Sequence, residues 1–318
     1  MKQAVSIIGC GVSGLTTAVV LQRQGWEATI YTDQAPEETV SAVAAAIWFP
    51  YEVHPQEKAN VWSLASYLEF EELSKDPASG VSMVPLTVIV RDEADAWWTA
   101  GLPGHAIRQA RPEEVPSAYS FAYRMTVPLI ETQLYLPYLL REFRGAGGLL
   151  VNQKVDNIKN LTIKNLPVVN CTGMGAKELV GDSSLYPIRG QILKAEPIAG
   201  IEAMSADFTF GDAGEELAYI IPRRDCTVLG GTTGKGDYDL QPDEATNQGI
   251  LARCSTLSPL VKDARIQATA VGLRPGRPEI RLEREGNLVH NYGHGGGGYT
   301  VSWGCAYEVA NLLKGFPS

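Results

Sequence analysis

The hydrophobic positions of the chain follow two periods, one typical of buried strands and one typical of helices. An apolar, β-branched run at residues 4–8 leads into residues 15–25, whose apolar positions recur at helical spacing, and a second strand is predicted at 27–31. Two further stretches, 166–176 and 289–306, show the same succession of a strand candidate, a turn and a helix. This succession predicts an α/β fold with the strands of one parallel sheet.

Other segments follow the same two periods, with turn residues between them. Helices are predicted at 56–75, 127–145 and 242–257, and strands at 84–91, 149–155, 217–222 and 227–231, the last two as a hairpin. Strand-rich segments, 50–135 and 187–270, lie between segments that resemble a nucleotide-binding fold, at 1–49, 136–186 and 271–318. The sequence therefore predicts two interleaved domains, because no linker separates two consecutive ones.

Three glycines stand directly between the first predicted strand and the first predicted helix. Gly9, Gly11 and Gly14 have the spacing of a dinucleotide-binding turn: the first permits the tight turn, the second lets backbone touch pyrophosphate, and the third lets the helix pack closely. Asp33 follows the second strand, where a carboxylate can bind both ribose hydroxyls and disfavours a 2′-phosphate. A generic strand-to-helix turn is the alternative, but it must explain both the spacing and the acid.

The segment 289–306 holds six glycines before its predicted helix. Glycine allows main chain to approach a ligand closely, and the N–H groups at a helix start attract an electron-rich group. By itself this pattern is typical of a structural turn; together with the first glycine motif it indicates docking of a large, partly anionic ligand. The six glycines are Gly293, Gly295, Gly296, Gly297, Gly298 and Gly304.

Composition narrows the class of protein. The chain has 318 residues, of which 45% are hydrophobic and 20% charged, which suffices for two domains with full cores. A net charge of −9 makes nucleic acid an unfavourable partner. We expect no membrane span and no secretion signal, so a cytoplasmic location is the default expectation. A homodimer is compatible with the sequence, although no surface loop carries a readable signature of assembly.

Cysteine and histidine spacing indicates neither a disulfide framework nor a metal site. The five cysteines are scattered without a paired spacing. His290 and His294 are four residues apart, but one lies on a predicted strand and the other in the glycine loop, so they do not share a helix face. We expect structural roles for both histidines and no metal.

Eight motifs in order give the chain a close resemblance to the D-amino acid oxidases, FAD enzymes of the glutathione-reductase-like flavoprotein class that include the D-aspartate oxidases. The motifs span nearly the whole chain and occupy residues 9–14, 44–51, 170–173, 187–191, 219–222, 272–278, 280–283 and 289–306. The resemblance implies a Rossmann-like FAD-binding domain interleaved with a mixed α+β substrate domain, with FAD held non-covalently.

The resemblance also implies the chemistry: hydride transfer from Cα of a D-amino acid to flavin N5, giving a 2-oxo acid, ammonia and, with oxygen, hydrogen peroxide. Arg274 and Tyr219 match the residues that bind the substrate carboxylate, and the carbonyl of Gly296 matches the acceptor for the amine. A guanidinium grips a carboxylate with two parallel hydrogen bonds, and three fixed attachments select one enantiomer. From residue type alone, Arg274 is equally suited to a surface ion pair and Tyr219 to an ordinary strand position.

The residues expected to bind FAD come from every part of the first predicted domain. They are Gly9, Gly11, Val12, Ser13, Gly14, Asp33, Ala45, Ala46, Val155, Thr172, Gly173, Arg274, Gly295, Gly296, Gly298, Tyr299 and Thr300. Arg281 either matches a family arginine near the flavin or belongs to an ion-pair ladder along a strand.

Departures from the family pattern concern the substrate side chain. Glu215 and Thr233 stand where relatives carry a second active-site tyrosine. Phe49, a histidine in D-aspartate oxidases, favours a neutral or apolar side chain, and Gly297 replaces a large residue, which predicts a roomier pocket. Arg223 and Arg224 favour an acidic side chain if they reach the substrate, but we expect solvated loop charges.

Three alternatives remain open at this stage. A relative that oxidises glycine, sarcosine or an acidic D-amino acid would use Arg274 and Tyr219 in the same way. A non-catalytic cofactor-binding protein would lack this pair. An NAD-linked dehydrogenase is disfavoured because the C-terminal glycine segment returns to the cofactor in the flavoprotein manner.

Overall fold

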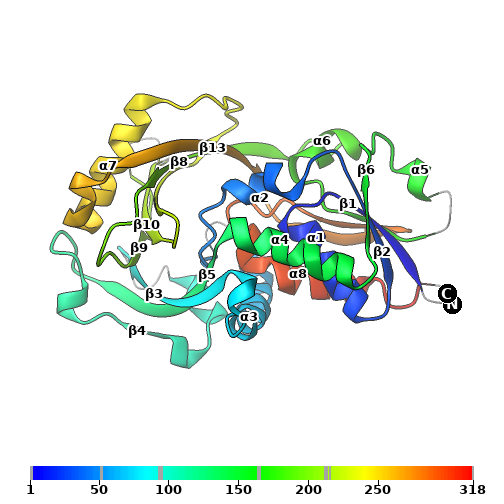
Figure 1. Cartoon of the computed structure of the whole chain (residues 1–318), viewed down its shortest axis with the longest axis horizontal. Coiled ribbons are helices and arrows are strands. Elements are labelled where there is room, and N and C mark those ends of the chain that lie inside the picture. Colours follow the sequence, from blue (N-terminus) through cyan, green and yellow to red (C-terminus); the bar gives the residue numbers. More distant parts are fainter. Residues whose placement is uncertain are drawn as a thin grey trace. The chain divides into compact units, whose positions relative to one another are not determined.

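The computed structural model describes residues 3–50, 53–91, 96–162, 166–210, 214 and 216–316. The chain forms two compact units, each assembled from segments that are distant in sequence (Figure 1). The first unit comprises Met1–Ser82, Ile130–Tyr186 and Arg274–Ser318, and the second comprises Met83–Leu129 and Pro187–Leu273.

The first unit contains a six-stranded sheet with the order β14-β15-β7-β1-β2-β6. Four neighbouring pairs are parallel (β15 with β7, β7 with β1, β1 with β2, β2 with β6), and β14 is antiparallel to β15. This confirms the predicted Rossmann-like α/β class. The strands are β1 (Ala4–Ile8), β2 (Glu27–Thr32), β6 (Leu149–Asn152), β7 (Val168–Asn170), β14 (Arg281–Glu285) and β15 (Leu288–Tyr292).

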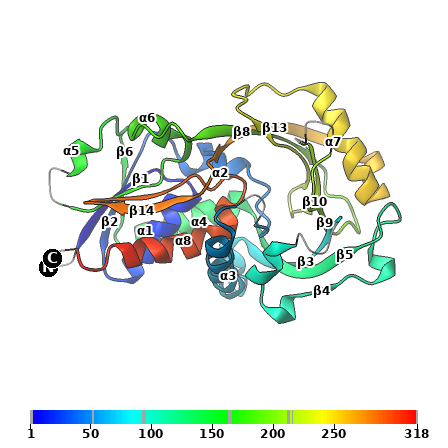
Figure 2. The same ribbon diagram turned by 180° about the vertical axis from the view of Figure 1, so that it is seen from behind.

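The helices of the first unit pack tightly around this sheet. The longer ones are α1 (Val12–Arg23), α3 (Gln56–Leu73), α4 (Thr132–Gly145) and α8 (Gly298–Leu312), and the short ones are α2 (Val40–Val43), α5 (Lys159–Thr162) and α6 (Ala176–Leu179). Every residue of α8 from Tyr299 to Ala306 is buried. Figure 2 shows α8 beside α1 on one face of the sheet.

The first domain boundary lies later in the chain than the sequence predicts, because α3 packs against α8. A Cβ at Gly304 would lie 2.3 Å from the backbone oxygen of Trp62, and Ser66 Oγ accepts the N–H of Trp303 at 3.1 Å and of Gly304 at 3.0 Å. Because α3 packs on α8 so closely, the first unit extends to Ser82, whereas the sequence placed the boundary after residue 49. The helix predicted at 127–145 also begins later, because the β-branched residues before position 131 belong to strand β5.

The second unit is built on a nine-stranded sheet. Its order is β12-β8-β11-β10-β9-β3-β5-β4, with β13 paired to β8. The strands are β3 (Val81–Ile89), β4 (Ile107–Gln109), β5 (Ala122–Ile130), β8 (Tyr186–Ala195), β9 (Ala203–Ala206), β10 (Glu216–Pro222), β11 (Thr227–Thr232), β12 (Gly234–Lys235) and β13 (Ile266–Gly276). The predicted hairpin is confirmed as the antiparallel pair β10 and β11.

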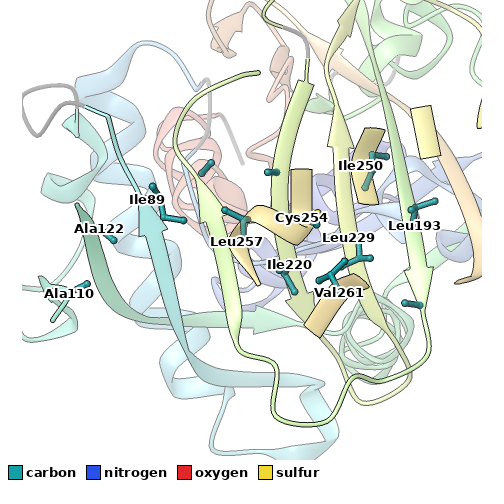
Figure 3. Close-up of a cluster of buried hydrophobic side chains, with 13 residues drawn as sticks. Ile89, Ala110, Ala122, Leu193, Ile220, Leu229, Ile250, Cys254, Leu257 and Val261 are labelled. Atoms are coloured by element: carbon teal, nitrogen blue, oxygen red, sulfur yellow. The ribbon is translucent and has the colours of Figure 1, made fainter. Parts of the chain in front are cut away.

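Helix α7 (Glu244–Leu257) covers one face of this sheet (Figure 3). Ile250, Cys254 and Leu257 recur at helical spacing and are buried against strand residues that include Ile220 and Leu229. The helix is capped by Asp243, whose carboxylate accepts the N–H of Thr246 at 2.7 Å. It therefore presents a fixed face to β10 and β11.

Short 3-10 segments complete the described chain, at Pro36–Glu38, Pro77–Ser79, Trp97–Gly101, Gly104–Ala106, Pro112–Glu114, Gly173–Gly175 and Pro259–Asp263. Among the described residues, no helix combines the length and the apolar character that a membrane crossing requires. All five cysteines are buried free thiols.

Candidate functional site

The predicted binding segments of the first unit meet at one edge of its sheet. Since β1, β2, β6, β7 and β15 are parallel, their carboxyl ends share that edge. The N–H of Cys171 donates to Ile8 O at 2.9 Å, and the N–H of Gln153 donates to Thr32 O at 2.7 Å. These bonds bring together the loops that follow the strands, which carry Gly9 to Gly14, Asp33, Val155, Thr172, Gly173 and the glycines from 293 onward.

Backbone packing explains the first glycine motif. Gly9 has a φ of +101°, and a Cβ there would lie 2.6 Å from Cys171 O. A Cβ at Gly14 would lie 1.9 Å from Gly9 O, so the third position has no room for a side chain. The turn and the close helix approach required by the motif are both present. Helix α1 begins at Val12, and its N-cap, Gly11, has no side chain to cap it, so the N-cap residue itself leaves the helix start uncovered.

Ser41, which no motif in the sequence indicates, supports two parts of this edge. Its hydroxyl oxygen accepts the N–H of Val12 at 3.0 Å, and its carbonyl accepts the hydroxyl of Tyr299 at 2.8 Å. One residue thus connects the starts of α1 and α8. The only local signal in the sequence was a run of small residues from 41 onward, which does not reveal contacts to positions 12 and 299.

The segment after α2 contributes two further predicted residues. Ala45 is half-buried, and Ala46 is buried and has a φ of +55°, a conformation that a residue other than glycine rarely adopts. Ala46 O accepts the N–H of Ile130 at 2.9 Å, which holds the segment in place. Asp33 is exposed directly after the end of β2, and Val155 is half-buried beyond the end of the neighbouring β6.

The segment with Arg274 lies against two of the predicted glycine turns. Gly295 donates its N–H to Pro275 O at 2.9 Å, and a Cβ at Gly173 would lie 3.7 Å from Pro275 Cγ. Thr172 is held by Asn170, whose side-chain oxygen accepts the Thr172 N–H at 3.1 Å and hydroxyl at 2.7 Å. Arg274, itself half-buried, therefore adjoins the residue that fixes Gly295.

At the start of α8, the side chains of Tyr299 and Thr300 bond to other residues of the protein, so main-chain groups are what this helix start offers to a ligand. Its N-cap, Gly297, provides no side-chain cap. The hydroxyl of Thr300 accepts the N–H of Phe49 at 3.1 Å and donates to Phe49 O at 3.0 Å. The side chains of Tyr299 and Thr300 thus hold the segments of Ser41 and Phe49, and cofactor contacts from this helix start are expected from its main chain.

His294 connects the two glycine motifs. It is buried, its Nε2 lies 2.9 Å from Asn291 Oδ1, and its Nδ1 lies 3.5 Å from Ser13 Oγ. Because the Asn291 oxygen is an acceptor, Nε2 carries the proton and Nδ1 faces Ser13 as an acceptor. Burial lowers the pKa of His294 to about 4. The ring is therefore neutral at ordinary pH, and the expected structural role fits this position.

Two expectations about individual residues are corrected, and the place of a third residue is given. Gly297 does not widen the pocket, since a Cβ there would lie 2.2 Å from Val53 Cγ2 and that methyl fills the space. Arg223 is not a solvated loop charge, because it is only 7% exposed, whereas Arg224 is exposed. Thr233 is buried.

Arg281 belongs to the ion-pair alternative. It bonds to Tyr292 Oη at 2.9 Å and Glu283 at 2.7 Å, and it lies 3.9 Å from Asp182. Glu215 and Tyr51 lie outside the described residues. Within the described part of the chain, no group of three potential metal ligands gathers.

In the second unit, Tyr219 is half-buried on β10 and pairs in register with Gly230 on β11. A Cβ at Gly230 would lie 2.0 Å from Cζ of the Tyr219 ring. The ring therefore lies directly on the backbone of the neighbouring strand.

Comparison with known proteins gives the class of the chain. Residues 4–312 match the family model described as FAD dependent oxidoreductase. A D-amino-acid oxidase of Rubrobacter xylanophilus is 43% identical, and the match covers 96% of this chain and 94% of that protein. The D-aspartate oxidase of Homo sapiens is 32% identical, with coverage of 98% and 94%. The solved structure of a glycine oxidase from Geobacillus kaustophilus shares the fold, with a TM-score of 0.79 at 20% identity and coverage of 99% and 96%.

The chain belongs to the FAD dependent oxidoreductase family and is an oxidoreductase whose cofactor is FAD. The resemblance found in the sequence is confirmed. The edge described above fits this cofactor, since it combines a glycine turn at a helix start, an exposed carboxylate beyond β2 and a second helix start lined by main chain.

Proposed function

We propose that the protein oxidises D-amino acids to 2-oxo acids, with release of ammonia and formation of hydrogen peroxide. Bound FAD would supply the redox chemistry, which is acceptance of a hydride from substrate Cα and transfer of the two electrons to oxygen. The substrate also gives up a proton, and water then converts the imino acid to the 2-oxo acid and ammonia. The name and 43% identity of the Rubrobacter relative support this class of substrate.

The observation that carries the proposal is the hydrogen bond from Gly295 N–H to Pro275 O at 2.9 Å. It ties the backbone that directly follows Arg274 to the loop that contains Gly296. A carboxylate held by Arg274 and an amine that donates to Gly296 O are the two ends of an α-amino acid. We propose that the phenol of Tyr219 supplies a further hydrogen bond to the same carboxylate.

These groups bind and orient, and no side-chain base is needed in the proposal. Arg274 would fix the carboxylate, and Gly296 O would accept the amine, which together would leave Cα–H free to face a bound flavin. The Val53 methyl and the Phe49 segment limit the space beside this loop. Positioning of this kind accounts for enantiomer selection, because only one configuration satisfies all attachments while presenting Cα–H.

We propose a preference for neutral or apolar side chains. Phe49 is only 8% exposed and is fixed by Thr300, next to the start of α8. An aromatic ring offers no charge to an acidic side chain, and burial of an unpaired carboxylate is costly.

Acidic D-amino acids form the second candidate. Two observations favour it: Arg223 is buried, and the human D-aspartate oxidase is 32% identical. Neutral and acidic substrates would use Arg274 in the same way, so the side chain alone distinguishes them.

The test is peroxide formation by the purified, FAD-loaded protein with matched D- and L-amino acids. D-Ala, D-Met, D-Phe, D-Asp, D-Glu, glycine and sarcosine are compared with the L-forms of the chiral substrates. Peroxide from the neutral D-forms and not from the L-forms is expected. Activity confined to D-Asp and D-Glu would replace the neutral preference with the second candidate, and silence with every substrate would refute the proposed function.

A further inference from the structure

Tyr219 owes its place to the backbone beneath its ring. A Cβ at Gly230 would lie 2.0 Å from its Cζ, and a Cβ at Gly231 would lie 2.8 Å from its Oη. The phenol therefore lies across two consecutive glycines of β11. Any shift of β10 along β11 would carry the hydroxyl with it, so the register of these two strands fixes the position of the phenol.

That register is irregular immediately before Tyr219. Glu216 pairs with Thr232 and Tyr219 pairs with Gly230, with a shift between the two pairs. A bulge of this kind redirects a side chain and leaves carbonyl groups outside the regular ladder. Something must hold the irregular backbone in one arrangement if the phenol is to occupy one place.

Helix α7 bonds to the main chain at this point. The guanidinium of Arg253 donates through Nε to Leu217 O at 3.0 Å and through Nη2 to Gly231 O at 3.3 Å. Its Nη1 lies 3.0 Å from Glu216 Oε1. One planar group thus joins β10, at the bulge, to β11.

The next residue of the helix repeats this connection. Cys254 Sγ lies 3.3 Å from Tyr219 O and 3.5 Å from Gly230 O, so a single S–H serves the paired carbonyls on both strands. Figure 3 shows Cys254 on the helix face that also carries Ile250 and Leu257 and faces Ile220 and Leu229.

Side-chain alternation places these two groups behind Tyr219. Ala218 and Ile220 belong to the cluster packed against α7, so Tyr219 between them points to the opposite face of the sheet. Arg253 is a buried charge, 9% exposed, on a helix whose other buried contacts are apolar. Burial of a charge there is costly unless its hydrogen bonds are used.

We propose that Arg253 and Cys254 are positioning residues for substrate binding, which set the place of the Tyr219 phenol by holding the carbonyls of β10 and β11. The inference rests on the role proposed above for Tyr219. On this inference, residues of α7, on the face of the sheet opposite to Tyr219, affect the affinity for the substrate carboxylate.

The test compares Arg253→Lys and Cys254→Ala with Cys254→Ser, which keeps a donor, and with Tyr219→Phe. Cys226→Ala is the matched control, because it makes the same substitution at a buried cysteine beside the start of β11. For each FAD-loaded protein, KM and kcat are measured with D-alanine, and propionate, a carboxylate without an amine, is titrated against the flavin spectrum. Hydrogen exchange of residues 216–232 reports on the strands independently of turnover.

We expect a rise of about five- to tenfold in KM and in the propionate dissociation constant for Arg253→Lys and Cys254→Ala, with kcat within about twofold of the parent. Cys254→Ser should recover most of the affinity, and Cys226→Ala should match the parent. Faster exchange at Tyr219, Gly230 and Gly231 should accompany the loss.

If Tyr219→Phe weakens propionate binding while Arg253→Lys and Cys254→Ala do not, the inference is overturned and the proposed function stands. If the parent protein oxidises no D-amino acid, the proposed function fails. Hydrogen exchange then still tests whether Arg253 and Cys254 hold the backbone of β10 and β11. Unchanged exchange in both variants would then refute the backbone connection as well, and faster exchange at Tyr219 would support it.

Discussion

The Cγ2 methyl of Val53 occupies the space over Gly297, 2.2 Å from the point where a Cβ would stand. Val53 is buried at 1% exposure, so its side chain cannot turn out into solvent. Gly297 is the N-cap of α8 and follows Gly296, whose carbonyl is proposed to accept the substrate amine. The pair therefore sets how closely the loop approaches the rest of the first unit.

Gly297→Ala should destabilise the protein, and Val53→Ala should relieve part of that cost. Overpacking of this kind costs about 1–3 kcal/mol, so the single variant should melt several degrees lower. In a double-mutant cycle, we expect a favourable coupling of about 1 kcal/mol or more between the substitutions. Strictly additive free energies of unfolding from denaturant titration would contradict the contact.

Gly14→Ala should release FAD. A Cβ at this position would lie 1.9 Å from Gly9 O, which is main chain and yields only if the turn moves. We expect a loss of about 10- to 100-fold in FAD affinity, equivalent to about 1–3 kcal/mol. Flavin fluorescence on titration of the apoprotein measures it.

Gly145→Ala is the matched control for that experiment. Gly145 ends α4, is exposed, and has no atom within 4 Å of the Cβ position. Its substitution should leave FAD binding unchanged and stability equal or slightly higher. Equal FAD affinities for both variants would show that the turn accommodates a methyl group and would remove the argument from Gly14.

The loops that meet at the carboxyl edge of the first unit's sheet could be predicted from the sequence, because each is marked by a local signal. The spacing of Gly9, Gly11 and Gly14, an acid after the second strand and a glycine run before the last helix each report on a short stretch of chain. Because the strands are parallel, those stretches lie at one edge of the sheet, and this can be predicted without knowing any side-chain contact. The hairpin around Tyr219 was predictable for the same reason.

Contacts between distant residues were not predictable in this way. Nothing near Gly297 indicates that Val53 fills its space, and nothing near Thr300 indicates that its hydroxyl binds Phe49, 251 positions away. Burial of Arg223 also depends on tertiary packing, since its sequence neighbours Arg224 and Asp225 are exposed. The helix predicted at 127–145 begins only at Thr132, because residues 127–130 belong to strand β5, whose pairing is not visible in the local sequence.

Arg274→Met should cripple substrate binding and leave the protein yellow. Loss of a charge-assisted, bidentate partner for a carboxylate costs about 2–5 kcal/mol, which predicts a fall of about 30- to 1000-fold or more in kcat/KM with D-alanine. Arg274→Lys keeps the charge without the planar fork and should recover only a part. Steady-state kinetics and the flavin-to-protein absorbance ratio give both readouts.

Arg265→Met provides the control for Arg274, because its side chain is 83% exposed and it lies just before β13. It should retain parental kinetics. Near-normal turnover by Arg274→Met would remove Arg274 from the proposed role, and loss of FAD from the same variant would assign it to the cofactor.

His294 should make the stability of the protein fall between about pH 6.5 and pH 4. Burial lowers the pKa of His294 to about 4 in the folded protein, below the value near 6.5 of an unfolded chain. The unfolded state therefore takes up a proton first as the pH falls. The contribution of the neutral ring is complete above the unfolded pKa and is lost as the pH approaches the folded pKa.

His294→Asn, which cannot titrate in this range, should lose on the order of 2–3 kcal/mol of this pH dependence. The measurement is the free energy of unfolding of each FAD-loaded protein at pH 7 and at pH 4.5, with His105→Gln as control, since His105 is exposed. The difference between the two pH values should shrink in His294→Asn and persist in His105→Gln. An unchanged difference in His294→Asn would mean that the ring between Ser13 and Asn291 is not held neutral by burial.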